Sequence, residues 1–320
     1  MAEIAINDTK LVSVIIRTYN HEDYIYDTLQ SVLNQNYTKI QVIVVNDNST
    51  DRTEEIIFSI IEEHPGKITY FKNRKNIGEL QTYNKGLSLV KGKYVALLDG
   101  DDVYFPNKIR KQVEFLDNHQ NVTACYHDVA VFTQNPMDPS FYWSDRFDLK
   151  SGSSKTIARY GHFPCAVSVM LRREFMPDEG HSIFVKTQGD WLYLVDVLEN
   201  SGGEIQNINQ VLAGYRIHQK NISGNWQEKL ESRFISAELG SKKYPALKQE
   251  FTFYCSEMLF LKFLYCIGAK KFSLALKPLI LSLRKSFPNF LILFRIPFRE
   301  LKFLFKSKPK KDQFLSNFFN

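Results

Sequence analysis

The sequence predicts an α/β fold with a mostly parallel central sheet flanked by helices, followed by a helical C-terminal extension. Short apolar runs rich in β-branched residues alternate with segments of helical periodicity over the first two hundred residues, which is typical of βαβ units. Polar clusters stand at the ends of three of these runs, at Arg17–Asn20, Asn46–Asn48 and Asp99–Asp102. Parallel sheets bind their ligands at the carboxyl ends of their strands, so these clusters are candidate functional residues.

Four apolar runs are expected to be buried strands, because few polar residues interrupt them. They are Leu11–Ile16, Gln41–Val45, Ile68–Phe71 and Tyr94–Leu98. Apolar residues at helical spacing predict helices within 24–33, 56–61 and 80–90. Pro106 marks the start of a further helix, since proline is favoured in the first turn.

Charge is unevenly distributed along the 320 residues, which hold 41 Lys and Arg and 35 Asp and Glu, a net charge of +6. Lys262–Lys311 contains 13 of the bases and one acid, Glu300, a net charge of +12. The other residues hold 28 bases and 34 acids, a net charge of −6. A hydrophobic content of 44% excludes a disordered chain. An acidic body therefore carries a basic tail, which favours an anionic membrane surface or nucleic acid as partner.

Apolar and basic residues interleave at helical spacing from Trp226 onward, including Phe290–Phe305. Amphipathic helices of this kind lie in membrane interfaces, so we expect peripheral association with the inner-membrane surface. The alternative is a helical cap that packs on the catalytic domain. Nucleic acid is disfavoured as a partner, because the chain has no recognition motif and its Phe and Leu density suits lipid better than phosphate.

The start of the chain and its cysteines favour a cytoplasmic protein. Met1–Lys10 lacks a secretory leader, and no uncharged apolar stretch of about 18 residues predicts a transmembrane helix. The cysteines, none in a CxxC pair, are expected to be reduced and mostly buried: Cys125, Cys165, Cys255 and Cys266.

The turn Asp99-Gly100-Asp101-Asp102 places three carboxylates within four residues directly after a strand. Such neighbours repel one another and need a cation or solvent to be tolerated. Mg²⁺ and Mn²⁺ favour oxygen ligands shared between carboxylates and substrate phosphates, so the turn indicates a metal bridging to a diphosphate. The alternative is a solvated acidic turn with a helix cap. Nicotinamide, flavin and P-loop sites are disfavoured, because no GxGxxG follows an early strand and no GxxxxGK[ST] is present.

Several segments in order resemble the motifs of one enzyme family: VSVIIRTYN (Val12–Asn20), VVNDNSTD (Val44–Asp51), Asn76-Ile77-Gly78, Asn84-Lys85-Gly86 and LLDGDDVYFPNKI (Leu97–Ile109). They are similar to those of the family-two inverting nucleotide-sugar glycosyltransferases with the GT-A fold, which build bacterial cell-surface polysaccharides and glycans. The resemblance runs from Val12 to Ser223. It implies a GT-A domain at 10–225, with a nucleotide-sugar-binding half at 10–120 and an acceptor half at 121–225. The helical extension is then 226–320.

The resemblance also implies roles for single residues on the donor side. Thr18, Tyr19 and Asn76 would bind the donor, and Asp47 would hydrogen-bond the uracil; its alternative role is a helix N-cap. Asp99 would face the ribose, while Asp101 or Asp102 holds Mn²⁺ or Mg²⁺. Arg17 departs from the pattern, because the family usually has proline there. Asn46-Asp47 likewise stands where a pair of acids is commoner.

The segment Lys186–Leu192, KTQGDWL, resembles the one in which the family places its catalytic base. Asp190 fills the aspartate position and Gly189 replaces a glutamate. In an inverting displacement this carboxylate takes the proton of the attacking acceptor hydroxyl, in a transition state that resembles an oxocarbenium ion. Trp191 is expected to stack on an acceptor sugar. The alternative is that Asp190 only caps the helix Trp191–Leu198.

The segment Tyr215-Arg216-Ile217-His218 resembles the closing motif of the family. Arg216 is expected to bind phosphate through two hydrogen bonds, and His218 to ligate the metal or contact the diphosphate, with a structural histidine as the alternative. The sequence thus predicts transfer of a hexose or N-acetylhexosamine from a UDP-sugar to a saccharide acceptor, expected to be lipid-linked, at the cytoplasmic membrane face. A sugar nucleotidyltransferase and a catalytically degenerate scaffold with a membrane tail are the alternatives.

Overall fold

The computed structural model describes residues 10–161, 163–185, 189–219, 226–268 and 276–282. They fall into two compact units, of which the first comprises residues up to 154, 162–186 and 196–218 and the second the remainder. Ser223 and the apolar and basic segment Phe290–Phe305 lie outside the described residues.

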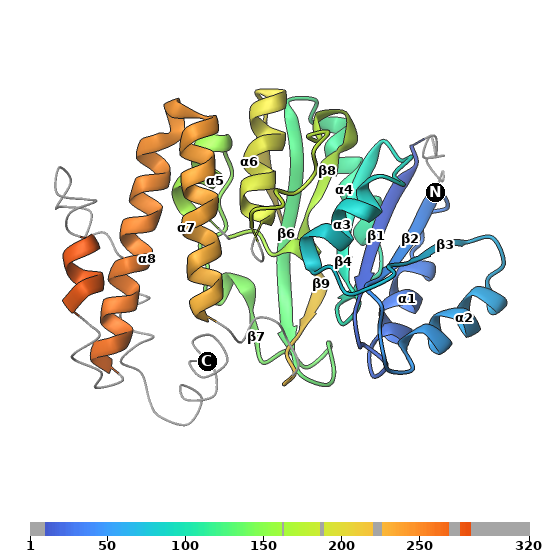
Figure 1. Ribbon diagram of the computed structural model, residues 1–320. Helices are drawn as coiled ribbons and strands as arrows, with labels where there is room; N and C mark the ends of the chain where they lie inside the picture. The colour runs from blue at the N-terminus through green and yellow to red at the C-terminus, as the bar shows by residue number, and fades with distance from the viewer. Residues whose placement is uncertain (1–9, 162, 186–188, 220–225, 269–275, 283–320) are drawn as a thin grey trace. The chain divides into compact units, whose positions relative to one another are not determined.

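One nine-stranded sheet forms the centre of the first unit, in the order β3-β2-β1-β4-β8-β6-β9-β5, with β7 paired to β6 (Figure 1). The first four strands are parallel: β1 (Val12–Thr18), β2 (Ile40–Asn46), β3 (Ile68–Lys72) and β4 (Tyr94–Asp99). They confirm the four predicted strands. The others are β5 (Val103–Tyr104), β6 (Val122–Phe132), β7 (Phe141–Tyr142), β8 (Met170–Arg172) and β9 (Glu204–Arg216). β8 is antiparallel to β4 and β6, whereas β6 and β9 are parallel.

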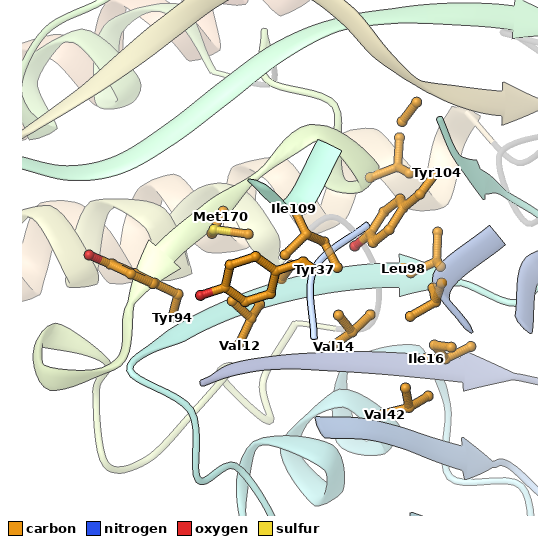
Figure 2. Packing of buried hydrophobic residues seen from close by; sticks show 14 of the residues in the cluster. Val12, Val14, Ile16, Tyr37, Val42, Tyr94, Leu98, Tyr104, Ile109 and Met170 are labelled. Carbon is orange, nitrogen blue, oxygen red and sulfur yellow. The ribbon is translucent and has the colours of Figure 1, made fainter. Parts of the chain in front are cut away.

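Helices join the parallel strands, as the sequence predicts: α1 (Ile25–Leu33), α2 (Thr53–Glu63) and α3 (Glu79–Leu87), with α4 (Lys108–Asn118) after β5. Apolar residues of α1, α2 and α4 form one core with Val14 and Ile16 of β1. Figure 2 shows Val14 and Ile16 with Ile109 of α4. α3 contacts β1 and β2 through the other face, where a Cβ on Gly86 would lie 2.3 Å from Cγ2 of Ile15. The sheet is therefore covered on both faces, as parallel sheets require.

The strand order creates a switch point between β1 and β4. From β1 the chain moves outward through β2 to β3, and then returns to place β4 on the opposite side of β1. In open α/β sheets, ligands bind beyond the carboxyl ends of the strands at such a point. Arg17 and Asp99 are register partners there, which puts the acidic turn directly beside the end of β1.

The second unit contains most of α5 (Ser154–Tyr160), the first half of α6 (Asp190–Ser201), and α7 (Trp226–Lys243) and α8 (Lys248–Gly268), which pack together. Trp191 is in its core, only 1% exposed. The indole Nε1 donates a hydrogen bond to the Ile157 carbonyl over 2.7 Å, and the ring packs against Tyr254 and Phe251. The structure thus gives Trp191 a packing role in place of the expected stacking on an acceptor sugar, because neither ring face is accessible.

The four cysteines are free and buried, as expected. Among the helices that the structure describes, none combines the length and the apolar character needed to cross a bilayer.

Candidate active site

The acidic turn brings Asp99, Asp101 and Asp102 together, so that one carboxylate oxygen from each lies within 4.8 Å of the others. Gly100 makes this turn possible. A Cβ there would lie 2.7 Å from Oγ1 of Thr18 and 2.6 Å from Nδ1 of His21, so any larger residue would push the turn away from the end of β1. The spacing that the sequence indicated is therefore a compact carboxylate cluster at the switch point.

Asp102 and Asp101 have different surroundings within the cluster. The Asp102 carboxylate accepts the backbone N–H of Arg216 over 2.9 Å; burial and the charges of Asp101 and Asp99 raise its pKa well above the ordinary value. Asp101 meets Nε2 of His218 at 3.0 Å and Nε2 of His21 at 3.8 Å. Burial alone would raise the pKa of Asp101, but the hydrogen bond with His218 and the nearby imidazoles lower it.

This donor set fits a divalent metal ion. Burial and the charges of Asp101 and Asp99 raise the pKa of Asp102, which indicates that gathering these carboxylates is unfavourable in the protein alone. A divalent cation would balance their charge, and carboxylate oxygens are the ligands that Mn²⁺ and Mg²⁺ favour. Asp101, Asp102 and the adjacent His218 remain the predicted ligands of such an ion.

Asp99 is engaged by side chains of β1 and α3. Arg17 donates from Nε to Oδ1 over 2.5 Å and from Nη2 to Oδ2 over 2.9 Å, and the Tyr83 hydroxyl donates to Oδ1 over 2.6 Å. Burial would lower the pKa of Arg17, but the charges of Asp99 and Glu79 raise it well above its ordinary value. Sequence reasoning placed Arg17 in a polar cluster at a strand end and noted it as a departure from the family pattern, but it missed Tyr83.

Asp47 holds the loop that follows β3. Its carboxylate accepts hydrogen bonds from Nδ2 of Asn73 over 2.7 Å and from the backbone N–H groups of Ile77 and Gly78, each over 2.9 Å. Gly78 has a φ of +87°, a conformation in which glycine is favoured. Asn76, a predicted donor-binding residue, is exposed on this loop, whereas the buried Asn73 was missed.

Thr18 ends β1 beside Asp47, and Tyr19 is the next residue. The Thr18 carbonyl accepts the Asp47 backbone N–H over 2.8 Å, and its Oγ1 lies 3.2 Å from Nδ1 of His21. Tyr19 is 39% exposed, so its ring is available to a ligand. The structure therefore gathers Thr18, Tyr19 and Asp47 at one edge, although only Tyr19 presents a large free surface.

Arg216 stabilises the acidic turn. Its guanidinium donates from Nε to the Asp101 carbonyl over 2.9 Å and from Nη2 to Oδ2 of Asp27 over 3.1 Å, and it lies over the Tyr24 and Phe132 rings. The predicted pair of hydrogen bonds to phosphate is replaced by these contacts, because the buried guanidinium faces its own protein. The place of Arg216 in the sequence motif could not have revealed these contacts within the protein.

His218 also packs on Tyr24, with ring centroids 4.4 Å apart, so its ring is held edge-on to Asp101. His21, to which sequence reasoning assigned no role, lies close to the same carboxylate, and burial lowers its pKa. The sequence does place His21 in the polar turn that follows β1, and that position could have marked it as a candidate site residue. In the structure its ring lies against Gly100.

Asp190 is the first residue of α6 and is partly exposed. The preceding Gly189 carbonyl accepts the backbone N–H of Tyr193 over 3.0 Å, which closes the first turn of the helix. Asp190 belongs to the second unit, and its role as base stays a prediction.

The sheet is mostly parallel, with a carboxylate cluster at its switch point and a second acid, Asp47, at the neighbouring strand end. This fold and site are those of a sugar-transferring enzyme of the GT-A type. The chain belongs to glycosyl transferase family 2, whose family model matches residues 13–202. It is a glycosyltransferase, and the α/β fold predicted from the sequence is confirmed.

Two relatives differ in how much of their length is matched. The chain is 28% identical over 236 residues to UDP-Glc:alpha-D-GlcNAc-diphosphoundecaprenol beta-1,3-glucosyltransferase WfaP of Escherichia coli, covering 73% of this chain and 89% of WfaP. It is 31% identical over 129 residues to the uncharacterized glycosyltransferase MJ1057 of Methanocaldococcus jannaschii, covering 40% of this chain and 44% of that protein.

Two solved structures share the fold. S. aureus TarS 1–349 in complex with UDP-GlcNAc has a TM-score of 0.60 at 18% identity, over 76% of this chain and 71% of that one. The mannosyltransferase PcManGT of Pyrobaculum calidifontis, in complex with GDP-Man and Mn²⁺, has a TM-score of 0.59 at 14% identity, over 98% and 86%.

Proposed function

We propose that this protein is an inverting, metal-dependent glycosyltransferase that moves a hexose or N-acetylhexosamine from a UDP-sugar to a saccharide acceptor. The observation that carries the proposal is the cluster of Asp99, Asp101 and Asp102 at the β1–β4 switch point, with one carboxylate oxygen from each within 4.8 Å of the others. A site that needs a cation at a sheet edge suits a diphosphate leaving group. WfaP, named for a UDP-glucose donor, and TarS, solved with UDP-GlcNAc, support UDP as the nucleotide.

The proposed reaction is a single displacement. The acceptor hydroxyl oxygen bonds to the anomeric carbon while the bond from that carbon to the diphosphate oxygen breaks, so UDP leaves and the configuration inverts. The Asp190 carboxylate accepts the hydroxyl proton, which makes it the general base. A bound Mn²⁺ or Mg²⁺ would neutralise charge on the leaving diphosphate.

Other residues of the chain bind and orient the donor. Asp47 fixes the loop of Asn73 and Gly78 at the edge of the sheet, so that the loop would keep one conformation when the uracil of the donor binds there. The exposed ring of Tyr19 offers a stacking surface at the end of β1. Arg17 and Tyr83 fix Asp99, which we propose faces the ribose.

Calorimetry with UDP tests the donor site. Wild type should bind UDP in the presence of Mn²⁺ and lose that heat in EDTA, whereas Asp101→Asn should weaken UDP binding at least roughly tenfold, since even indirect supports of a metal contribute that much. Asp138→Asn, at an exposed carboxylate, is the matched control. If neither EDTA nor Asp101→Asn changes the affinity for UDP, the donor site does not depend on a metal and the proposal is contradicted.

We also propose that the acceptor is lipid-linked and that the basic tail binds the cytoplasmic face of the inner membrane. WfaP, named for an acceptor linked to diphosphoundecaprenol, supports a lipid carrier. Truncation near Gly240 would not test this cleanly, because Gly240 packs against Phe251 of α8 and the cut would remove a core partner of Trp191.

The full chain allows a cleaner test of the tail. Wild type should float with vesicles of anionic lipid, while Arg295→Gln, Arg299→Gln, Lys302→Gln and Lys306→Gln combined should lower the partition coefficient by up to about a thousandfold, because each base near the surface contributes about 1 kcal/mol and about 1.4 kcal/mol is tenfold. Vesicles of neutral lipid serve as the control. Equal flotation of both proteins on anionic vesicles would argue against an electrostatic tail.

A further inference from the structure

The ion pair between Arg17 and Asp99 divides the carboxylate cluster into two parts. Arg17 is the register partner of Asp99 across the switch point, and both side chains are largely buried, 17% and 21% exposed. The arginine stands where the resembling family usually has proline, which could neither carry a charge nor donate from its backbone nitrogen. Its presence therefore changes the charge of the site.

Contacts on all sides fix the guanidinium. Besides its two hydrogen bonds to Asp99, Nη1 lies 3.3 Å from Oε2 of Glu79, and the guanidinium carbon lies 5.0 Å from the centre of the Tyr83 ring. Tyr83 in turn donates to the Asp99 oxygen that Arg17 Nε contacts. Two-point hydrogen bonding and stacking on an aromatic face are properties of arginine that lysine does not reproduce.

Both oxygens of Asp99 are thereby committed to protein donors. The Asp101 and Asp102 carboxylates instead meet imidazole and backbone N–H groups. All three acids nevertheless lie within metal-binding distance of one another. An uncompensated Asp99 would thus be a third candidate ligand for a cation bound by the other two.

We propose that Arg17 is a positioning residue that neutralises Asp99, keeps it out of the metal coordination, and leaves Asp101 and Asp102 to balance the charge of one divalent ion. This inference rests on the proposed metal-dependent function. It predicts that metal affinity without nucleotide is held down by Arg17, while donor affinity is supported by it, because Asp99 is then kept oriented for the donor.

Mn²⁺ binding without nucleotide, measured by the EPR signal of free Mn²⁺, tests this directly. Arg17→Met should bind Mn²⁺ about tenfold more tightly, because an added ionised carboxylate attracts the cation. In the presence of Mn²⁺ it should bind UDP several-fold more weakly. Arg52→Met, which breaks an exposed arginine–glutamate pair, is the matched control and should change neither value.

A double-mutant cycle separates this role from a structural one. In Arg17→Met/Asp99→Asn the gain in Mn²⁺ affinity should disappear, since the gain comes from Asp99. Asp99→Asn alone leaves the charge of Arg17 uncompensated beside the site and should weaken Mn²⁺ binding, while Asp102→Asn should lower the affinity more than about tenfold. The double variant, which should bind Mn²⁺ with about the wild-type affinity, decides the proposal even if Arg17→Met alone does not fold.

Three outcomes would overturn the inference. One is a folded Arg17→Met with unchanged or weaker Mn²⁺ binding, and another is an Arg17→Met/Asp99→Asn that loses Mn²⁺ as Asp102→Asn does. Both would leave the proposed function standing. Wild type that binds no Mn²⁺, with or without UDP, would refute the metal-dependent function and this inference together.

Discussion

Replacing Asp190 by asparagine should abolish sugar transfer while leaving UDP binding intact. A positioned general base typically contributes 10²–10⁴-fold, so we expect transfer to fall at least about a hundredfold. Asparagine has nearly the shape of aspartate, and the hydrogen bond that closes the first turn of α6 is accepted by the Gly189 carbonyl, so this turn should persist. Transfer is measured as UDP release with acceptor present, and donor binding by calorimetry with Mn²⁺.

Asp178→Asn is the matched control for this variant, because Asp178 is an exposed carboxylate in the segment between β8 and α6. It should keep wild-type transfer. If Asp190→Asn keeps most of its transfer activity, the base must lie elsewhere and Asp190 only caps the helix. If it loses both UDP binding and thermal stability, the residue supports the fold and the test of catalysis must use a donor-saturated assay of the folded fraction.

The parallel half of the sheet could be predicted from the sequence because its signals are local. Val12–Thr18 and Tyr94–Asp99 are buried along almost their whole length, and such strands have continuous apolar runs. The acidic turn follows a strand directly, so its three carboxylates had to be neighbours. Prediction therefore worked where the chain itself brings the residues together.

The antiparallel part and several contacts of the site depend on pairings that are distant in the chain. β8 is only three residues long and lies between β4 and β6, a place that periodicity does not reveal. Tyr83 reaches Asp99 across 16 positions and Arg216 reaches Asp101 across 115. Burial of Trp191 depends on α8, more than fifty residues later. Residue type predicted a ligand for Arg216 and for Trp191, whereas tertiary packing gives each of them a partner within the protein.

Lys108 is a buried cation for which sequence reasoning offered no role. It begins α4 with its side chain fully buried; Nζ donates to Oε1 of Gln112 over 2.6 Å and lies 3.9 Å from the centre of the Tyr104 ring. Among the described residues no carboxylate forms an ion pair with it. Burial lowers its pKa from 10.5 to about 7, despite an opposing effect of Cys125.

The lowered pKa makes stability depend on pH in a defined direction. Between about pH 7 and 10.5 the unfolded chain keeps the proton on Lys108 and the folded protein loses it. The unfolded state therefore binds more protons, and the contribution of Lys108 to stability improves as pH rises through this window. Below about pH 7 the penalty for burying the group is complete, and above 10.5 it vanishes.

Lys108→Met should therefore stabilise the protein, by on the order of 4 kcal/mol at pH 6 and about half of that at pH 9. Methionine fills the same volume without a charge, so the core should remain packed. Urea unfolding of wild type and variant at both pH values measures the difference, and subtraction removes the contributions of other titrating groups. Lys67→Met, at an exposed lysine, should show no such difference. A Lys108→Met gain that is the same at pH 6 and pH 9 would mean that the ammonium group stays charged in the folded protein, held by partners stronger than Gln112 and Tyr104.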